Sequence, residues 1–227
     1  MRAIIVADGD LARPLAGREA LLAPDADGPP LVIAADGGAR KAAEVGLVPE
    51  LVVGDGDSLG AADLAALRDR GVEVHLLPAE KDESDTELAL REALARGARE
   101  IVILGAFGGR RLDHVLASIA LLALPELAGH DVTLRDGTTT VRLVGSTAGP
   151  GELSIAGGPG DLVSLFPVDA TVEGIMTEGL RYPLRGESLT LGPSRGLSNQ
   201  LIGPAARLTI GRGRLLVVHT QGGGDER

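Results

Sequence analysis

The sequence predicts an α/β domain with a doubly wound parallel sheet, followed by an antiparallel β-sandwich. In the first 136 residues, short β-branched apolar segments alternate with helical segments. These apolar segments are hydrophobic on both faces, as in a parallel sheet that helices cover on both sides. After Gly137 the helical period disappears, and short strands separated by glycine and proline follow one another. We therefore expect two domains, residues 1–136 and 137–227.

The first domain contains six apolar segments that we expect to be strands: Ala3–Ala7, Leu31–Ala35, Leu51–Val53, Val72–Leu77, Ile101–Leu104 and Val132–Leu134. Four segments between them have the composition of helices: Gly38–Val45, Ala61–Arg70, Thr86–Arg96 and His114–Leu124. Gly71, Gly97 and Pro125 follow the last three of these, and both residue types end helices. The alternation favours βαβ units and therefore a parallel sheet.

The second domain contains seven short segments that we expect to be strands: Thr138–Val144, Glu152–Ile155, Leu162–Phe166, Ala170–Ile175, Ser188–Leu191, Ala206–Ile210 and Arg214–His219. Glycine-rich turns separate several of them, including Gly145–Gly151 and Gly157–Gly160. Strands at this spacing indicate an antiparallel sandwich or barrel. The last segment, Gln221–Arg227, combines three glycines with charges, so we expect the end of the chain to fray.

Composition excludes several classes of function. The chain has a net charge of −10, and such a surface repels the phosphate backbone of nucleic acids. There is no cysteine, which excludes disulfides, thiolate nucleophiles and cysteine-ligated zinc. The apolar segment at the N-terminus ends at Asp8 and is too short for a signal peptide or a membrane span. We therefore expect a cytoplasmic enzyme without nucleic-acid or membrane partners.

Acidic and glycine-rich residues follow the predicted strands of the first domain. Asp8 follows the first strand, Asp36 the second and Gly54–Ser58 the third, while the next two strands lead into residues 81–85 and 105–113. In an open α/β sheet, ligands bind beyond the carboxyl ends of the strands. Clustered carboxylates repel one another unless cations neutralise them, and Mg²⁺ favours carboxylate and phosphate oxygens. The sequence therefore predicts a magnesium site at this edge.

Two of these segments also have a purely structural interpretation. Residues 54–58 have the composition of an ordinary acidic turn. Ser84 and Glu87 have the spacing of a capping box, so the acids around them would serve to start a helix. This is compatible with metal binding by Asp85. If Asp82 and Asp85 lie in one helical turn, we expect them to share a face.

The glycine-rich segment Gly105–His114 carries two arginines just before a predicted helix. Its backbone amides and guanidinium groups could hold phosphate, whereas the alternative is a flexible turn with both arginines in water. We expect His114 to be a residue of the helix start rather than a metal ligand. A Walker loop is excluded, because the only lysines, Lys41 and Lys81, do not follow glycine.

Taken in order, these segments resemble the thiamine pyrophosphokinase family. The matching stretches are Ala35–Ala39, Gly54–Ser58, Lys81–Leu90, Gly108–His114 and, in the second domain, Ser194–Asn199. The resemblance implies a homodimer whose active site lies between the α/β domain of one subunit and the sandwich of its partner. It also implies that the pyrophosphoryl group of ATP is transferred to the hydroxyl of thiamine, giving thiamine diphosphate and AMP.

The resemblance also implies roles for individual residues. Asp55, Asp57 and Asp85 match the Mg²⁺ ligands. Arg111 and Asp113 match the loop that handles the transferred phosphates, and either Asp85 or Asp113 accepts the hydroxyl proton. Substrate contacts are implied for Asp36, Gly37, Asp82, Arg110, Ser198 and Asn199, of which the last two match thiamine contacts. Either Arg110 or Arg111 takes the phosphate role, and the distance from Asp113 favours Arg111.

The chain departs from the family pattern at several places: the stretch Gly108–Asp113 is one residue longer than the usual form, and Ser84 replaces a threonine. Gly56 stands where relatives often have an aromatic residue, and Leu215–His219 lacks the tryptophan that some relatives place near thiamine. Two other functions stay open, a pyrophosphokinase for another small alcohol such as a hydroxymethyl pterin and a non-catalytic thiamine diphosphate sensor. The sensor is disfavoured because no expected metal aspartate is missing. The match at Ser198 and Asn199 disfavours a metal-dependent phosphohydrolase.

Overall fold

The computed structural model describes residues 1–11, 17–109, 111–145 and 151–222. The chain divides into two compact units, Met1–Gly137 and Thr138–Arg227. Three expectations fall wholly or mainly outside the described residues: the role of Arg110, the turn that spans residues 146–150, and the frayed end at 223–227. No helix in the described part of the chain is long and apolar enough to cross a membrane.

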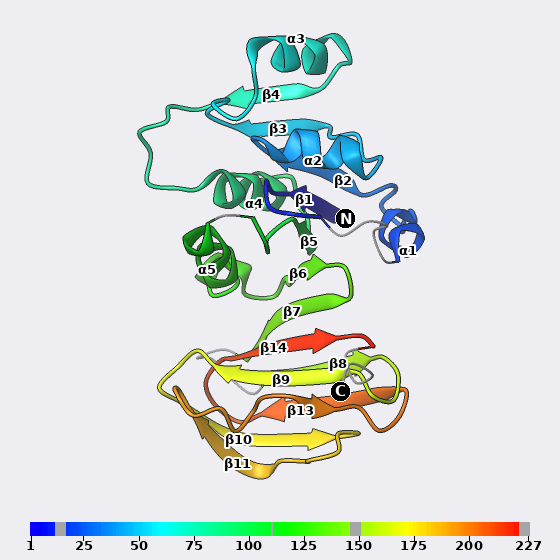
Figure 1. Ribbon diagram of the computed structural model, residues 1–227, viewed down its shortest axis with the longest axis vertical. Helices are drawn as coiled ribbons and strands as arrows, with labels where there is room; N and C mark the ends of the chain where they lie inside the picture. The colour runs from blue at the N-terminus through cyan, green and yellow to red at the C-terminus, as the bar shows by residue number, and fades with distance from the viewer. Residues whose placement is uncertain (12–16, 110, 146–150, 223–227) are drawn as a thin grey trace. The chain divides into compact units, whose positions relative to one another are not determined.

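The first unit is built on a parallel sheet with the strand order β6-β5-β1-β2-β3-β4 (Figure 1). Its strands are β1 (Arg2–Val6), β2 (Leu31–Ala35), β3 (Leu51–Gly54), β4 (Glu73–Leu76), β5 (Glu100–Leu104) and β6 (Asp131–Asp136). The order runs outward from β1 through β2 to β4 on one side and through β5 to β6 on the other. The point where the order reverses, beside β1, is where such sheets bind ligands.

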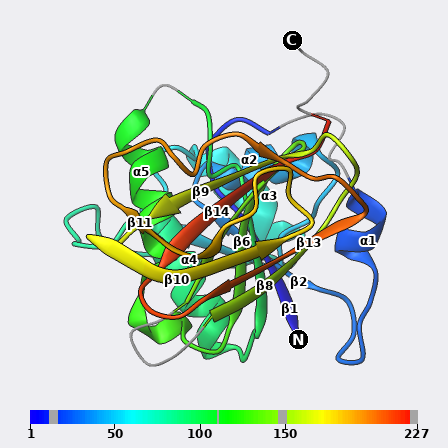
Figure 2. The same cartoon turned by 90° about the horizontal axis from the view of Figure 1, so that it is seen from below.

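Helices cover both faces of this sheet. They are α1 (Arg18–Leu22), α2 (Gly38–Glu44), α3 (Ala61–Asp69), α4 (Asp85–Ala95), α5 (Leu112–Leu121) and the 3₁₀ turn η1 (Pro125–Leu127). Even-numbered strand residues such as Ile4 and Val32 pack with Leu21 of α1 and Ala42 of α2, as a period of two requires. Helix α4 packs on β1, β2 and β3 and contacts α5. Figure 2 shows α1 and α5 on opposite sides of the sheet.

The predicted doubly wound α/β fold is confirmed, with all six strands and four helices near their predicted bounds. Two details differ. Helix α1 was not predicted, because five residues are too few to show a helical period. Helix α4 begins at Asp85 with Ser84 as its N-cap, whose side chain accepts a hydrogen bond from the Glu87 N–H at 3.2 Å. Asp82 therefore precedes the helix, so Asp82 and Asp85 do not lie in one helical turn and the condition for a shared helical face is not met.

The second unit consists of two antiparallel sheets, which confirms the predicted sandwich. One has the order β7-β14-β9-β12 and the other the order β11-β10-β13-β8. The strands are β7 (Thr139–Val144), β8 (Gly151–Ala156), β9 (Leu162–Pro167), β10 (Thr171–Glu178), β11 (Arg185–Thr190), β12 (Asn199–Gln200), β13 (Ala205–Ile210) and β14 (Leu215–Thr220). One core of aliphatic side chains, including Val163, Ile175 and Leu208, joins both sheets.

The second unit also contains a buried pair of polar side chains, Asp161 and His219. Asp161 and His219 are both almost fully buried, and His219 Nε2 lies 3.0 Å from Asp161 Oδ2. The backbone N–H groups of Gly158 and Gly222 donate to the same carboxylate at 3.0 and 2.9 Å. Burial acts to raise the pKa of Asp161, but these hydrogen bonds outweigh it and lower the pKa.

Candidate functional site

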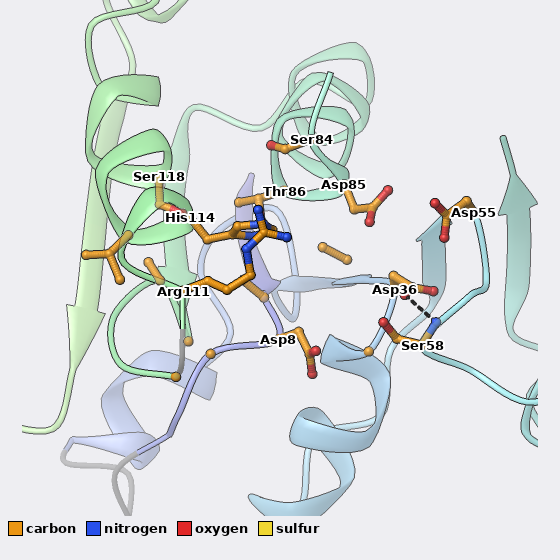
Figure 3. Close-up of a pocket in the computed structure, with 18 of the residues that line it drawn as sticks. Asp8, Asp36, Asp55, Ser58, Ser84, Asp85, Thr86, Arg111, His114 and Ser118 are labelled. Carbon is orange, nitrogen blue, oxygen red and sulfur yellow. Dashed lines mark hydrogen bonds between the residues drawn. The ribbon is translucent and has the colours of Figure 1, made fainter. Parts of the chain in front are cut away.

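A pocket of about 480 Å³ lies at the carboxyl ends of the strands in the first unit. Its walls come from the residues at and beyond the ends of β1, β2, β3, β4 and β5 and from the N-terminal parts of α4 and α5. Its ionisable lining residues are Asp8, Asp36, Asp55, Asp57, Lys81, Glu83, Asp85, Arg111 and His114. Figure 3 shows aspartates from several loops around one space, with Arg111 and His114 approaching from α5. The pocket therefore has a strongly acidic wall and a basic wall.

The acidic wall centres on Asp36, Asp55 and Asp57. Each offers one carboxylate oxygen, and these oxygens lie within 4.8 Å of one another. Asp36 is 4% exposed and has φ 42°, a left-handed conformation that aspartate tolerates better than most residues. Its Oδ2 accepts a hydrogen bond from the Ser58 N–H at 3.1 Å, drawn dashed in Figure 3. Gly54 leaves room for the Asp36 side chain, because a Cβ on Gly54 would lie 2.7 Å from the Asp36 Cβ.

The other oxygen of Asp36 indicates a missing partner. Asp36 Oδ1 is buried and has no hydrogen-bond partner among the described residues. A buried polar atom without a partner is costly, and so is a cluster of three close carboxylates without a cation. One hard divalent cation would relieve both costs, and Mg²⁺ takes such oxygen ligands. The residues present therefore fit a magnesium ion.

Lys81 stands beside this cluster. It is 13% exposed, and its Nζ lies 3.0 Å from Asp85 Oδ1 and 3.7 Å from Asp55 Oδ2. Burial acts to lower the pKa of Lys81, but the neighbouring carboxylates of Asp85 and Asp55 outweigh it and raise the pKa. The hydrogen bond from the Asp57 N–H lowers the pKa of Asp55, whereas burial raises the pKa of Asp85 in spite of Lys81. The neighbouring Asp8 also has a pKa raised by burial.

The basic wall comes from the start of α5. Arg111 is the N-cap residue, and His114, Val115 and Ser118 line the pocket at helical spacing. The Arg111 guanidinium forms an ion pair with the exposed Asp113, with Nε donating to Oδ1 at 3.2 Å. The hydrogen bond from Arg111 lowers the pKa of Asp113 to about 2.

The glycine-rich loop before α5 also lines the pocket, through Gly105, Ala106, Gly108 and Gly109. Gly108 and Gly109 have φ of 75° and 76°, which favours glycine. The Gly109 N–H donates to Asp10 Oδ2 at 2.9 Å, so this amide is already occupied. In this conformation, the Gly109 N–H is therefore not one of the backbone amides that could bind phosphate.

The structure brings together most of the residues that the sequence singled out in the first domain. Asp36, Gly37, Asp55, Asp57, Asp85 and Arg111 all line the pocket. The oxygens that come closest belong to Asp36, Asp55 and Asp57, whereas the predicted ligand Asp85 pairs with Lys81 in the same pocket. Asp82 is exposed, and neither Asp82 nor Asp113 belongs to the lining.

The two predicted thiamine contacts lie in the second unit. Ser198 has φ 58°, and its N–H donates to Ser164 Oγ at 3.0 Å. Asn199 is buried, and its side chain holds the backbone of Tyr182 from both sides: Oδ1 accepts from the Tyr182 N–H at 3.0 Å, and Nδ2 donates to the Tyr182 carbonyl at 2.7 Å. The Tyr182 side chain is 64% exposed, and the Arg181 guanidinium lies 5.7 Å from the ring centre. Asn199 therefore positions an exposed aromatic ring.

Sequence reasoning did not give a role to several residues of the pocket, among them Ser58, Lys81, His114 and Ser118. For the last two a signal exists, because Arg111, His114 and Ser118 are three and four residues apart and so share one helix face. The spacing of Lys81 and Asp85, four residues apart, is also a local signal, whereas the ion pair of Lys81 with Asp55 joins two loops that are distant in sequence.

Comparisons with known proteins agree with the geometry. The model of the thiamin pyrophosphokinase catalytic domain matches residues 26–134, and the model of the thiamin pyrophosphokinase vitamin B1 binding domain matches residues 152–215. A curated relative, the thiamine pyrophosphokinase of Bacillus subtilis (strain 168), is 28% identical over 191 residues, which are 84% of this chain and 87% of that protein.

Solved structures show the same architecture. The crystal structure of thiamine pyrophosphokinase from Bacillus subtilis has a TM-score of 0.81 and 25% identity, covering 97% of this chain and 99% of that one. The enzyme from Geobacillus thermodenitrificans has a TM-score of 0.78 and 28% identity, covering 97% of both chains. The thiamin pyrophosphokinase from Candida albicans shares the fold, with a TM-score of 0.76 and 15% identity over 96% of this chain and 88% of that one. Because matches to both domains of one family follow in the same order and span most of the sequence, the chain belongs to the thiamine pyrophosphokinase family.

Proposed function

We propose that this chain transfers the pyrophosphoryl group of ATP to the primary hydroxyl of thiamine, with Mg²⁺ held by the aspartates of the pocket. Family membership supports the reaction, and the match to a vitamin B1 binding domain favours thiamine over another small alcohol. The observation that carries the site assignment is the unpartnered Asp36 Oδ1 beside Asp55 and Asp57. Because the reaction consumes ATP, we also propose that it takes place in the cytoplasm.

Asp36, Asp55 and Asp57 are the residues placed to hold the metal, with Asp85 in the same pocket. When bound, Mg²⁺ supplies positive charge that offsets the triphosphate and the charge developing on the leaving AMP. The aspartates directly follow the buried strands β2 and β3, and this keeps them in place before the substrates arrive. Lys81 holds the Asp85 carboxylate and adds a second positive charge on this side of the pocket.

Arg111 is the phosphate-binding residue of the opposite wall. Its guanidinium is paired with Asp113 in the described conformation, and both side chains are exposed. A phosphate oxygen forms a charge-assisted hydrogen bond with guanidinium, which can replace or share the bond to Asp113. We therefore assign Arg111 to a non-bridging oxygen of the transferred group and Asp113 to the orientation of Arg111.

Asp85 is better suited than Asp113 to accept the proton of the thiamine hydroxyl. Burial raises the pKa of Asp85, which lines the pocket, whereas Arg111 holds the pKa of Asp113 at about 2. A carboxylate with a higher pKa is the stronger base. As the proton moves to Asp85, the hydroxyl oxygen bonds to the β-phosphorus of ATP. The bond from the β-phosphorus to the bridging oxygen breaks, and that oxygen leaves with AMP.

We further propose a homodimer in which the second unit of a partner completes this site with its thiamine contacts. On α5, Leu112 and Leu116 are 71% and 60% exposed and lie four residues apart, beside the pocket-lining Val115. Around the segment with Ser198 and Asn199, the second unit exposes Tyr182, Leu197 and Ile202. Exposed apolar groups gathered near functional residues are typical of interaction surfaces. Tyr182 supplies a ring on which the rings of thiamine can stack.

The proposal is tested by incubating the purified protein with ATP, Mg²⁺ and thiamine and separating the products by chromatography. We expect thiamine diphosphate and AMP in equal amounts, and neither product when Mg²⁺ is chelated. Formation of ADP or free phosphate without thiamine diphosphate would contradict the proposed transfer. In that case the pocket would serve another acceptor or hydrolysis.

A further inference from the structure

The first unit has a second pocket, of about 380 Å³, which lies between α2 and α3 and is separate from the aspartate pocket. Apolar side chains make up most of its lining, including the buried Leu47, Leu59 and Val72. Two exposed alanines, Ala43 of α2 and Ala66 of α3, line it from the two helices. Its volume lies in the range of small-molecule sites, roughly 300 to 1,000 Å³.

Three charged residues line this pocket, and one positive charge is left over. Arg40 of α2 is paired with Asp63 of α3, with Nε donating to Oδ2 at 3.0 Å. Arg70 follows α3 and is exposed, and it has no charged partner among the described residues. The pocket is therefore complementary to a molecule with an apolar body and one negative charge.

The two helices that line this pocket start from the loops of the aspartate cluster. Helix α2 begins two residues after Asp36, and Leu59 of the pocket lining directly follows Ser58. The hydrogen bond from the Ser58 N–H to Asp36 Oδ2 connects these two loops, and the Arg40–Asp63 ion pair connects the first turns of the two helices next to them. A molecule held between α2 and α3 therefore acts on the same two loops.

We propose that the pocket between α2 and α3 binds a small amphipathic anion, whose apolar body fills the cavity and whose carboxylate pairs with Arg70. Binding changes the spacing of α2 and α3 and thereby the hydrogen bond between Ser58 and Asp36. This pocket is separate from the site of the proposed reaction, and binding of an anion there does not depend on which substrates the aspartate pocket takes. Its coupling to the aspartate loops gives the chain a means of control by a molecule unlike either substrate.

Octanoate is a suitable probe, because it has an apolar chain and one carboxylate. Binding is measured by calorimetry and by NMR on the full chain, with octanol and octylamine as uncharged and cationic analogues. We expect octanoate to bind most tightly. Arg70→Gln should weaken octanoate binding about tenfold, the loss of one charge-assisted hydrogen bond, and should leave octanol binding unchanged. The control Arg68→Gln changes an exposed arginine of the same helix that does not line the pocket.

A second pair of variants tests the cavity itself. Ala66→Phe places a ring in the pocket and should abolish octanoate binding, whereas Ala65→Phe adds the same ring at the adjacent exposed position outside it. Both positions are on the exposed side of α3, so we expect both variants to fold, as circular dichroism will show. Failure of octanoate to bind the parent chain, or undiminished binding to Ala66→Phe, would overturn the site.

The coupling is read out separately from the exchange of the Ser58 amide hydrogen with solvent. This amide donates to Asp36, so its exchange rate reports on the hydrogen bond that connects the two loops. We expect saturating octanoate to change this rate in the parent chain and in Ala65→Phe, and to leave it unchanged in Ala66→Phe. If octanoate binds and the Ser58 rate stays the same in every variant, the proposed coupling is wrong.

Discussion

Replacing Lys81 with methionine tests the electrostatics of the aspartate pocket. The Lys81 ammonium lies 3.0 Å from Asp85 and 3.7 Å from Asp55. Coulomb's law with an effective dielectric constant of about 20 gives about 5.5 and about 4.5 kcal/mol for these pairs. The cost of removing the ammonium from water and the partial exposure of all three groups offset most of this. We therefore expect Lys81→Met to lower the free energy of unfolding by about 2 kcal/mol in the absence of metal.

For a chain of this length, such a loss lowers the melting temperature by about 4 to 8 °C. Saturating Mg²⁺ should reduce the loss by more than half, because the cation neutralises the carboxylates that Lys81 otherwise neutralises. Thermal unfolding followed by circular dichroism gives the loss of stability in EDTA and the loss in excess Mg²⁺. This method suits a chain without tryptophan.

The matched control is Arg91→Met, which removes exposed ion pairs to Glu83, Glu87 and Glu126. Exposed pairs contribute about 0 to 1 kcal/mol, so we expect a small loss that Mg²⁺ does not change. An equal loss for Lys81→Met in EDTA and in Mg²⁺ would refute the reasoning, because it would mean that the metal does not bind the carboxylates beside Lys81.

Five further substitutions have defined outcomes. Asp57→Asn should reduce turnover at least about a hundredfold with an unchanged melting temperature, because one metal ligand loses its charge; near-normal turnover would remove Asp57 from the site. Tyr182→Ala and Asn199→Ala should both raise the KM for thiamine more than that for ATP, and an equal rise for both substrates would contradict their placement. Leu116→Glu should convert a dimer into a monomer in sedimentation, and a fully active monomer would refute the shared site. Asp161→Asn should lower the free energy of unfolding by about 2 kcal/mol at pH 7. Because folding lowers the pKa of Asp161, the stabilisation by its carboxylate is complete above about pH 4 and is lost as the pH falls through the folded pKa. An equal loss of stability at pH 3 and at pH 7 would contradict this role of Asp161.

The strands and long helices could be predicted because burial fixes their composition. Strands β1, β2 and β5 are buried on both faces and therefore read as continuous aliphatic runs. The two-residue strand β12 and the five-residue helix α1 were missed, since neither is long enough to show a period. The start of β11 was predicted three residues too late, because its first residues, Arg185, Gly186 and Glu187, are not apolar and none of them is buried.

The candidate site could be predicted as far as it depends on the ends of strands. Parallel strands end at one edge, so Asp36, Asp55 and Asp57 were expected to meet there. The hydrogen bonds that give other residues their role join segments distant in sequence, and no local pattern reports them. Asn199 illustrates this, because its side chain is engaged by the backbone of Tyr182, 17 positions away. The contact with thiamine that the family resemblance implies for Asn199 stays a prediction.

The central claim is that Asp36, together with Asp55 and Asp57, holds the metal of the reaction. A calorimetric titration with Mg²⁺ of the parent chain, Asp36→Asn and the exposed control Asp82→Asn tests it most directly. Asparagine tolerates the φ of 42° at position 36 and can still accept the Ser58 hydrogen bond, so the loop is preserved while the charge is lost. We predict that Asp36→Asn weakens Mg²⁺ binding at least about tenfold and that Asp82→Asn does not. Mg²⁺ binding of equal strength in all three proteins would contradict the account.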